Sequence, residues 1–376
     1  MKRTLGIIGQ VYKEGDMGGL CKSRSVSMLP YGCRYRLMDF TLSNMTNYGI
    51  TSIAIYPGKK IRSTMDHIGT GQPWDLNRRF QGIFLFPPVT SDHYTLKFGE
   101  IGEYYSTVHF FKRSREKYIF FARPNILVKP DLDEAFDYFL KTNADITLLY
   151  CSLQDEKMEY LNTDKIHLNE DGTLLNLGIN LGTESQFNMY LGMFFMKKDL
   201  FIKLLEDTLE KGDASTVEDM INNHKNKLLV NSYKYSGTME NIRNVSSYYQ
   251  ANMNLLDNED YEKHFQKGAR IYTKTKDEPS TIYLEDAHTR NILSANGCII
   301  NGEVENSLLF RGVNIKKGAL VRNSIIMQKS EIGKDAVVIN AIVDKGVVIE
   351  DGVTIVGSAA QPYVIEKGMV ITGDEG

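Results

Sequence analysis

The stretch Ile326-Met-Gln-Lys-Ser-Glu-Ile332-Gly-Lys-Asp-Ala-Val-Val338 decides the fold of the carboxyl-terminal part of the chain, because its aliphatic residues recur every six positions. After one step of five, the series resumes at Val343, Ile349 and Ile355. A period of six fits neither an α-helix nor a simple hairpin. It is typical of a three-sided parallel β-helix, in which each aliphatic residue points inward and the stacked rungs bury a core that no single rung has.

A local phrase, Ile-x-x-Gly-apolar, accompanies this period. It occurs as Ile315-Lys-Lys-Gly-Ala319, Ile349-Glu-Asp-Gly-Val353 and Ile365-Glu-Lys-Gly-Met369, and Ile332-Gly-Lys-Asp-Ala336 is a variant of it. The glycine or aspartate allows the chain to turn at the corner between two sides of a coil. An irregular β-sandwich is the alternative fold for this part, and the repetition favours the β-helix.

The first two thirds of the chain have a different periodicity. Short β-rich runs, such as Ile53–Tyr56, Tyr118–Phe121 and Ile146–Tyr150, are each followed by helix-like sequence. The segment Asp131–Leu140 has acidic residues at its start and an apolar stripe, as amphipathic helices do. Alternating strands and helices predict an α/β layer with a largely parallel sheet, whose ligands bind beyond the carboxyl ends of the strands.

The change of periodicity predicts two domains connected by a linker. A length of 376 residues, which is long for a single hydrophobic core, also favours two domains. We predict a first domain over residues 1–256, a polar linker over 257–290 and a β-helix domain over 291–376. The linker contains Asp257-Asn-Glu-Asp260 and Lys274-Thr-Lys-Asp-Glu-Pro279.

The composition excludes several classes of protein. A net charge of -3 without a long Lys/Arg run predicts neither a nucleic-acid-binding nor a membrane-binding protein. We find no apolar stretch long enough to span a bilayer, and we therefore expect a cytoplasmic location. The cysteines Cys21, Cys33, Cys151 and Cys298 lack metal-ligand spacing, so we expect buried free thiols and no metal site.

Three segments resemble bacterial glucose-1-phosphate adenylyltransferases. They are Pro30-Tyr-Gly-Cys-Arg-Tyr-Arg-Leu-Met-Asp-Phe-Thr-Leu-Ser-Asn44, Pro73-Trp-Asp-Leu-Asn-Arg78 and Tyr248-Tyr-Gln-Ala-Asn-Met-Asn-Leu-Leu256. With the hexad repeats, the resemblance covers nearly the whole chain. It implies a Rossmann-like nucleotidyltransferase domain followed by a left-handed parallel β-helix of hexapeptide repeats.

The chain departs from this family in the loop after its first strand. Active members have a Gly-Gly-x-Gly-x-Arg-Leu type of loop that holds the nucleotide's phosphates. Here the sequence is Gly9-Gln-Val-Tyr-Lys13, and Gly15, Gly18 and Gly19 do not restore the spacing. We therefore expect an ordinary surface loop.

Further departures affect the residues that the family uses for chemistry. The resemblance places Val26 where the family has a phosphate-facing lysine, and it places Asn125 and Asn241 where the family has its two magnesium-binding aspartates. An amide oxygen carries no formal charge, so it is a poor substitute for a carboxylate beside Mg²⁺. The family's sugar-phosphate Glu-Lys-Pro phrase aligns with Gly178-Ile-Asn-Leu-Gly182, which has no lysine.

The family's effector site is the one binding site for which this chain keeps matching residues. Arg24 and Arg36 occupy positions of the family's effector-site arginines, and Lys22 and Arg34 are close to them in sequence. Arginine binds phosphate through a planar, bidentate fork. Solvated surface charge is the alternative interpretation of these four residues.

The resemblance and the departures together imply a regulatory subunit with no catalytic residues and no cofactor of its own. Mg²⁺ is then expected only at a catalytic partner subunit, in a mixed tetramer or, alternatively, a homo-oligomer, with a phosphorylated metabolite as effector. A working transferase with unusual metal ligands, such as Asp39, Asp131 or Glu240, is the second interpretation. A hexapeptide acyltransferase is the third, but such enzymes take a histidine from the β-helix and none follows His288.

Overall fold

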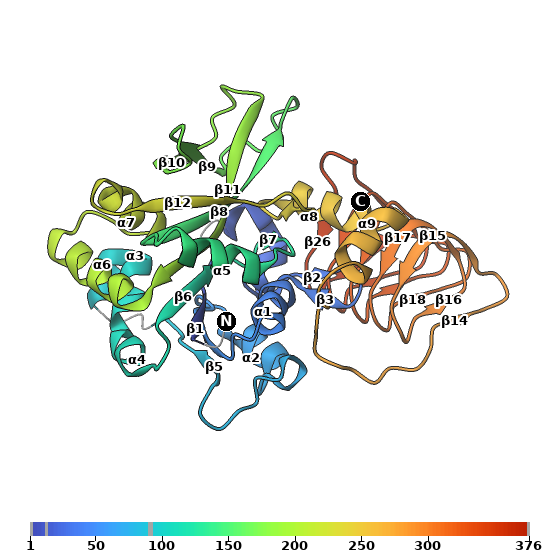
Figure 1. Ribbon diagram of the computed structural model, residues 1–376. Coiled ribbons are helices and arrows are strands. Elements are labelled where there is room, and N and C mark those ends of the chain that lie inside the picture. Colours follow the sequence, from blue (N-terminus) through green and yellow to red (C-terminus); the bar gives the residue numbers. More distant parts are fainter. Residues whose placement is uncertain (1–2, 12–13, 89–92, 374–376) are drawn as a thin grey trace. The chain divides into compact units, whose positions relative to one another are not determined.

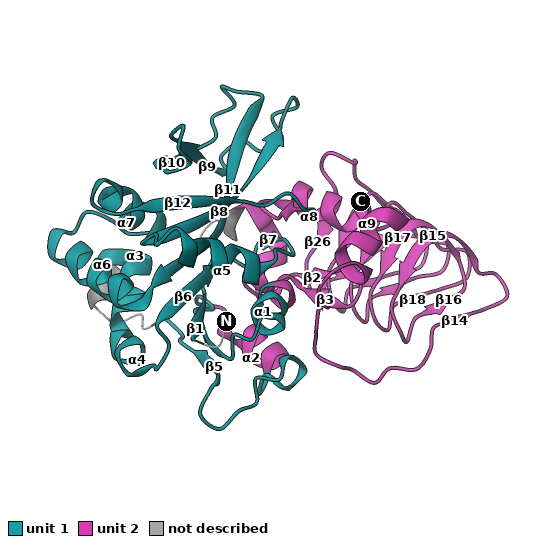
Figure 2. Ribbon diagram, in the orientation of Figure 1, with its two compact units in different colours: residues 1–10, 41–59, 69–238 teal, residues 11–40, 60–68, 239–376 magenta. Residues whose placement is uncertain are grey.

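A computed structural model describes residues 3–11, 14–88 and 93–373, which form two compact units (Figures 1 and 2). Unit 1 contains residues 1–10, 41–59 and 69–238, and unit 2 contains residues 11–40, 60–68 and 239–376. Each unit therefore gathers segments that are far apart in the chain. The domain boundaries at residues 256 and 290 stay a prediction.

Unit 1 is built on a nine-stranded sheet. One half consists of four parallel strands in the order β6, β1, β4 and β5. Their bounds are β6 (Tyr118–Ala122), β1 (Thr4–Ile8), β4 (Ser52–Ile55) and β5 (Gly82–Leu85). These strands are short and β-rich, as the sequence predicted. Strands β1, β4 and β6 are almost completely buried, whereas residues Ile83–Leu85 of the edge strand β5 are half-buried.

The other half of this sheet is mixed, which corrects the prediction of a largely parallel sheet. Strand β11 runs antiparallel to both β6 and β8, and β9 and β10 form an antiparallel pair. Their bounds are β8 (Ile146–Gln154), β9 (Asp164–Leu168), β10 (Leu174–Ile179), β11 (Gln186–Lys197) and β12 (Val230–Lys234). Only residues 169–173 link β9 to β10, which is too short for a crossover, so these two neighbouring strands run antiparallel.

Alternate side chains of the strands bury two different faces of the sheet. Phe121 and Phe194 stack on one face and belong to a core shared with helices of unit 1. Phe120 and Phe195 lie on the other face, where Phe195 contacts Phe139 of α5. The helices are α3 (His93–Ser106), α4 (Val108–Arg113), α5 (Leu132–Lys141), α6 (Lys198–Lys211) and α7 (Val217–His224). The predicted acidic helix start is confirmed, because the Asp131 side chain caps α5 by accepting from two backbone N–H groups.

Unit 2 contains a three-sided coil of parallel strands. One side carries β14 (Ile282–Tyr283), β16 (Ile299–Ile300), β18 (Asn314–Ile315), β21 (Glu331–Ile332), β24 (Val348–Ile349) and β27 (Val370–Ile371). The second side carries β19 (Leu320–Arg322), β22 (Val337–Ile339) and β25 (Thr354–Val356), and the third β20 (Ile325–Ile326), β23 (Ala341–Val343) and β26 (Tyr363–Ile365). Strands β15 (His288–Ser294) and β17 (Glu303–Leu309) run along the second and third sides.

The predicted inward row of this coil is confirmed. Ile326, Ile332, Val338, Val343 and Ile349 are fully buried, and in the last coil Ile355 is half-buried against the same core. The parallel β-helix architecture is thus present, and its left-handedness stays a prediction.

Most coils of the β-helix have the same length. Ile315, Ile332 and Ile349 are paired in register 17 residues apart, which is two steps of six and one of five. One early coil is shorter, because Ile300 pairs with Ile315 after 15 residues. The last is longer, because Ile349 pairs with Ile371 after 22 residues.

Left-handed backbone conformations mark the corners of the coil. One corner carries asparagines, Asn306, Asn323 and Asn340, with φ of 45°, 47° and 49°. A second corner carries Gly312, Lys329 and Gly346, and a third carries Gly318, Asp335 and Gly352. Glycine, asparagine and aspartate tolerate this conformation best. The predicted Gly/Asp corner is therefore found, and the asparagine corner adds to it.

Unit 2 contains further segments besides the coil. They are η1 (Glu14–Cys21), β2 (Pro30–Tyr31), β3 (Tyr35–Arg36), α2 (Ile61–Ile68), α8 (Val245–Asn254) and α9 (Asn258–Tyr261), while α1 (Leu37–Asn47) belongs to both units. Of these segments, η1 contacts β26 and α8 contacts β17. The Tyr249 hydroxyl of α8 donates to the backbone oxygen of Asn323 over 2.6 Å. The ring of Tyr35 stacks on that of Phe265 with centroids 4.6 Å apart.

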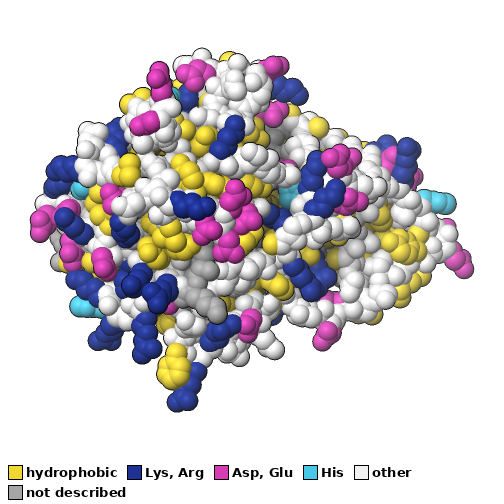
Figure 3. Space-filling view, in the orientation of Figure 1, with side chains coloured by type: hydrophobic (Ala, Val, Ile, Leu, Met, Phe, Trp, Pro, Cys, Tyr) yellow, Lys and Arg dark blue, Asp and Glu magenta, His cyan; other side chains and the backbone are white. Residues whose placement is uncertain are grey.

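Two expectations from composition can be compared with the fold. All four cysteines are free and buried, as predicted. Within the described residues, no helix has the length and apolar character needed to cross a membrane. On the face shown in Figure 3, basic and acidic side chains are mixed over the surface.

Candidate functional site

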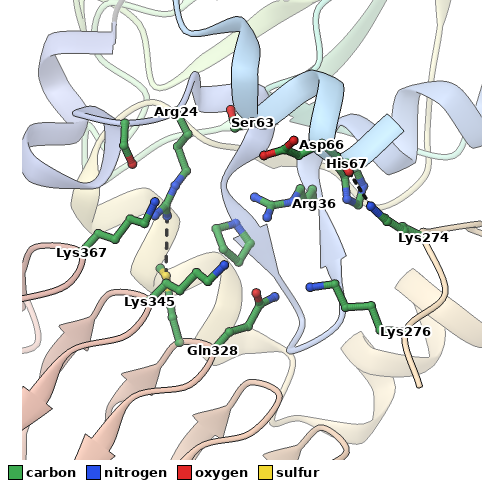
Figure 4. A pocket seen from close by; sticks show the side chains of 13 residues that line it. Arg24, Arg36, Ser63, Asp66, His67, Lys274, Lys276, Gln328, Lys345 and Lys367 are labelled. Carbon is green, nitrogen blue, oxygen red and sulfur yellow. Dashed lines mark hydrogen bonds between the residues drawn. The ribbon is translucent and has the colours of Figure 1, made fainter. Parts of the chain in front are cut away.

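A basic cavity of about 180 Å³ lies within unit 2 (Figure 4). Its basic lining residues are Arg24, Arg36, Lys274, Lys276, Lys345 and Lys367. The other lining residues are Ser23, Pro30, Ser63, Asp66, His67, Met327 and Gln328, so a single carboxylate lines the cavity beside six cations. Arg36, Lys276 and Lys345 point toward the middle of the cavity from three different segments of unit 2.

The β-helix supplies two of these cations through its corners. Lys345 and Lys367 directly precede the left-handed glycines Gly346 and Gly368, whose φ angles are 69° and 73°. The preceding strands β23 and β26 are paired in register, with Val343 opposite Ile365. The two lysines therefore hold equivalent places on successive coils.

Arg24 faces the cavity from the loop after η1 and is held by a buried ion pair. Its Nη2 lies 2.7 and 2.9 Å from the two carboxylate oxygens of Asp344. Arg24 is 5% exposed and Asp344 1% exposed. Asp344 Oδ1 also accepts from the backbone N–H of Lys345 over 2.6 Å. The coil thus fixes the position of the guanidinium.

Arg36 lies on β3 beside α2. Its guanidinium donates to the backbone oxygen of Met28, and its backbone N–H donates to Asp39 Oδ2 over 2.9 Å. Asp39 in turn pairs with His67 Nε2 at 2.5 Å, which fixes a residue of the cavity wall. Burial, and after it the charge of Arg24, lowers the pKa of Arg36 to about 10.

Two lysines of the cavity have lowered pKa values for the same reasons. Burial lowers the pKa of Lys345, and the charges of Lys367 and Arg36 lower it further. Burial likewise lowers the pKa of Lys276, followed by the charges of Lys345 and Arg311. Repulsion among the cations exceeds their neutralisation by nearby acids. An anion with two or more charges would relieve it, and guanidinium groups suit phosphate, sulfate and carboxylate.

The four residues proposed from sequence for anion binding are placed differently. Arg24 and Arg36 line this one cavity. Lys22 does not line it, and its exposed ammonium pairs with Glu366 at 2.6 Å. Arg34 does not line it either and is exposed.

The sequence interpretation missed four lysines of the cavity: Lys274, Lys276, Lys345 and Lys367. Lys274-Thr-Lys276 was part of the predicted linker, and the Lys274 ammonium donates to the backbone oxygen of Asp66 over 2.5 Å. Lys345 and Lys367 each precede a corner glycine, in Asp344-Lys-Gly346 and Glu366-Lys-Gly368, and this shared position is the sequence signal that could have found them.

The three positions that the resemblance assigns to phosphate and metal binding carry uncharged side chains, Val26, Asn125 and Asn241. Val26 is buried in the 3₁₀ helix η2 (Val26–Met28) of unit 2. Asn125 is half-buried between β6 and β7 (Ile126–Leu127) of unit 1, and Asn241 is buried in β13 (Glu240–Asn241) of unit 2. Over residues 3–11, 14–88 and 93–373, no group of three His, Cys, Asp or Glu side chains is placed to hold a metal ion. Amides in place of carboxylates do not fit the family's Mg²⁺.

The glycine-poor segment after β1 is only partly the surface loop that we predicted. Tyr12 and Lys13 lie outside the described residues. Gly15, Gly18 and Gly19 belong to η1, a 3₁₀ helix interrupted at Gly18, whose φ is 49°. The correction is that hydrogen-bonded turns replace an open loop there.

The spare acids of the second interpretation are engaged in the fold. Asp39 pairs with His67, as above, and Asp131 caps α5. Glu240 accepts from the Asn254 side chain over 3.1 Å, and burial raises its pKa. These contacts give each carboxylate a structural function.

Comparison with known proteins identifies similar chains. Residues 280–371 match the family model described as GlmU-like, C-terminal hexapeptide. The chain is 33% identical over 368 residues to the glycogen biosynthesis protein GlgD of Bacillus subtilis, covering 98% of this chain and 97% of that protein. It is 35% identical to GlgD of Geobacillus stearothermophilus, covering 85% and 83%. It is 29% identical to the glucose-1-phosphate adenylyltransferase of Clostridium perfringens strain 13, covering 94% and 92%.

Proposed function

Because the chain belongs to the family of GlgD glycogen biosynthesis proteins and glucose-1-phosphate adenylyltransferases, we propose that it is a non-catalytic or weakly active regulatory subunit. Its partner is an active adenylyltransferase subunit that makes ADP-glucose from ATP and glucose 1-phosphate for glycogen synthesis. The two subunits assemble in the cytoplasm.

The observation that carries this proposal is the pair of amides at the family's metal positions. Asn125 and Asn241 stand where the resemblance requires aspartates. In adenylyl transfer the metal neutralises the charge that develops as pyrophosphate leaves. A chain without the two carboxylates lacks the groups that would hold the metal. Mg²⁺ then acts only at the catalytic partner.

The basic cavity of unit 2 supports a regulatory function. Six cations around about 180 Å³ are a site for a small multivalent anion rather than for a reaction. We propose a phosphorylated metabolite as the ligand, with Arg24 and Arg36 as its guanidinium contacts. The cavity requires no catalytic group for this function.

A regulatory subunit acts by binding its partner's more competent state better than the less competent one. Such coupling is typically worth about 1–3 kcal/mol, or roughly 5- to 150-fold in affinity or population. The β-helix is a rigid, elongated element suited to assembly. We propose a mixed tetramer, with a homo-oligomer as the alternative.

ADP-glucose formation tests the proposal. The chain alone, the active subunit of the same cell alone and their mixture are assayed with ATP, glucose 1-phosphate and Mg²⁺, together with co-purification and light scattering. We expect little product from the chain alone, a stable mixed complex and higher turnover or substrate affinity in the mixture. Turnover of about 1 to 1000 per second by the chain alone would favour the transferase with unusual ligands. Failure to form a mixed species at micromolar concentration, with unchanged kinetics of the active subunit, would refute the regulatory function.

Two sets of variants separate catalysis from regulation. Asn125→Asp with Asn241→Asp should not restore full activity, because the phosphate-binding loop and the lysine replaced by Val26 are still missing. Arg24→Ala and Arg36→Ala should leave assembly intact and change the mixture's response to phosphorylated metabolites. Arg34→Ala is the matched control, since Arg34 is an exposed arginine of the same segment outside the cavity.

A further inference from the structure

A buried ion cluster lies in unit 1, where β1 and β6 end. Arg123 directly follows β6, and its guanidinium binds both oxygens of Glu100 over 2.8 and 2.9 Å. It also binds both oxygens of Glu218 over 3.2 and 2.7 Å. A fifth bond, of 2.7 Å, reaches the backbone oxygen of Gln10, which follows β1. A guanidinium has five N–H donors, so these five bonds use all of them.

Two glycines in left-handed conformations, Gly192 and Gly99, leave space for the ion pairs of Arg123. Gly192 of β11 has a φ of 64°, and a Cβ there would lie 2.8 Å from Arg123 Cγ. Glu100 follows Gly99, where a φ of 55° breaks α3. Its carboxylate also accepts from the Tyr104 hydroxyl and from the backbone N–H of Val217. The cluster therefore joins the ends of β1 and β6 to α3 and α7.

This position is the one at which open α/β sheets bind their ligands, beyond the carboxyl ends of the parallel strands. Here Glu100 is 1% exposed and Arg123 9% exposed, so the position is filled by protein. The Arg123 guanidinium also lies over the Phe121 ring, 5.1 Å from its centroid. The Phe121 ring could otherwise stack on a nucleotide base, and the Arg123 guanidinium could bind a phosphate. Because these two side chains lie against each other, neither is available to a ligand.

The charge of the cluster is unfavourable for a nucleotide. Two carboxylates surround one guanidinium, and Glu103 is close enough to Glu100 for their charges to interact. Burial, and after it the charge of Glu100, raises the pKa of Glu103 to about 7. Both carboxylates bond to the Arg123 guanidinium, so its charge is neutralised within the protein and attracts a triphosphate only weakly.

We propose that Glu100, Arg123 and Glu218 close the carboxyl edge of the unit 1 sheet to nucleotides. The chain's own ion cluster occupies the place of the ligand. This inference deepens the proposed function and rests on it, since a subunit could lose its metal ligands and still bind ATP. Closure of the site removes the binding step as well.

Nucleotide binding without turnover tests this closure. Hydrogen exchange of the full chain is measured with ATP and Mg²⁺ and, separately, with adenosine, each up to about 1 mM, the weak end of ordinary affinities. Sulfate is present throughout to fill the basic cavity of unit 2. We expect unchanged exchange over residues 98–104, 118–123 and 217–221 in the wild-type chain. Ligand-dependent protection there would overturn the inference, and without turnover it would leave the regulatory function standing.

A triple variant provides the converse test. Arg123→Ala with Glu100→Gln and Glu218→Gln removes the guanidinium without leaving a buried carboxylate unpaired, so the fold should survive. We expect adenosine to protect the same three segments in this variant. The matched control is Arg311→Ala with Glu278→Gln, an arginine–glutamate pair of unit 2, which should behave as wild type. A folded triple variant, verified by circular dichroism, that shows no protection would overturn the inference.

Discussion

The ion pair between Arg24 and Asp344 gives the sharpest prediction about stability. In Arg24→Ala, the Asp344 carboxylate loses both bonds to Nη2 and stays 1% exposed, with the Lys345 backbone N–H as a remaining donor. Removing one partner of a buried ion pair costs about 3–5 kcal/mol. Because one bond to the carboxylate survives, we expect the lower end, about 3 kcal/mol. That is roughly a 150-fold change in the unfolding equilibrium.

Urea unfolding followed by far-UV circular dichroism measures this loss, and hydrogen exchange at β20 and β23 assigns it to the coil. Trp74 is the only tryptophan and belongs to unit 1, so its fluorescence reports that unit separately. Arg34→Ala serves as the exposed control. Combining Arg24→Ala with Asp344→Ala should recover part of the loss, because no charge is then left unpaired. A loss below about 1 kcal/mol for Arg24→Ala, the range of exposed ion pairs, would refute the reasoning.

Sulfate keeps its charge as the pH rises, whereas Lys345, with its pKa lowered from 10.5, loses its proton earlier than an ordinary lysine. Calorimetry should therefore show sulfate affinity falling while the pH is still below 10.5. Lys345→Gln should weaken sulfate binding about tenfold at pH 7. Without sulfate, stability should rise over the same range, because the unfolded chain then holds more protons. Asn323→Ala should destabilise the coil by about 1–2 kcal/mol through its left-handed backbone, whereas Asn323→Gly should be nearly neutral, as thermal unfolding will reveal. Glu103 binds protons more tightly in the folded state, with a pKa raised from 4.5 to about 7. The free energy of unfolding should therefore fall as the pH rises from 4.5 to about 7. Equal slopes of unfolding free energy against pH for wild type and Glu103→Gln would contradict this assignment.

The parts of the fold that repeat locally could be predicted from sequence. The hexad period identified the inward row of the coil, because each residue's burial follows from its place in the repeat. The packing of residues 14–40 against the coil could not be predicted. Arg24 and Asp344 are 320 residues apart, and no local pattern connects them. Residues 190–196 of β11 were expected as a core strand, but its antiparallel direction could not be predicted, because an apolar run does not show which way a buried strand runs.

The candidate site was predictable in part, for similar reasons. Arg24 and Arg36 came from the family resemblance, and the cavity brings them together with four lysines from other segments. Those lysines lie in a loop and at corners, where composition does not distinguish ligand-binding cations from solvated ones. The bonds of Arg123 could not be predicted either, since they depend on two glutamates 23 and 95 residues away in sequence.

The unequal coil lengths show where this domain tolerates changes in chain length. The 15-residue coil is short because only two residues, 301 and 302, separate β16 from β17, whereas four separate β18 from β19. The 22-residue coil is long because residues 357–362 separate β25 from β26, where Asn340 alone separates β22 from β23. Both changes fall at corners, and the strands on either side keep their register. The corner after β25 is therefore the place at which a peptide tag or a fluorophore can be inserted without displacing the inward row.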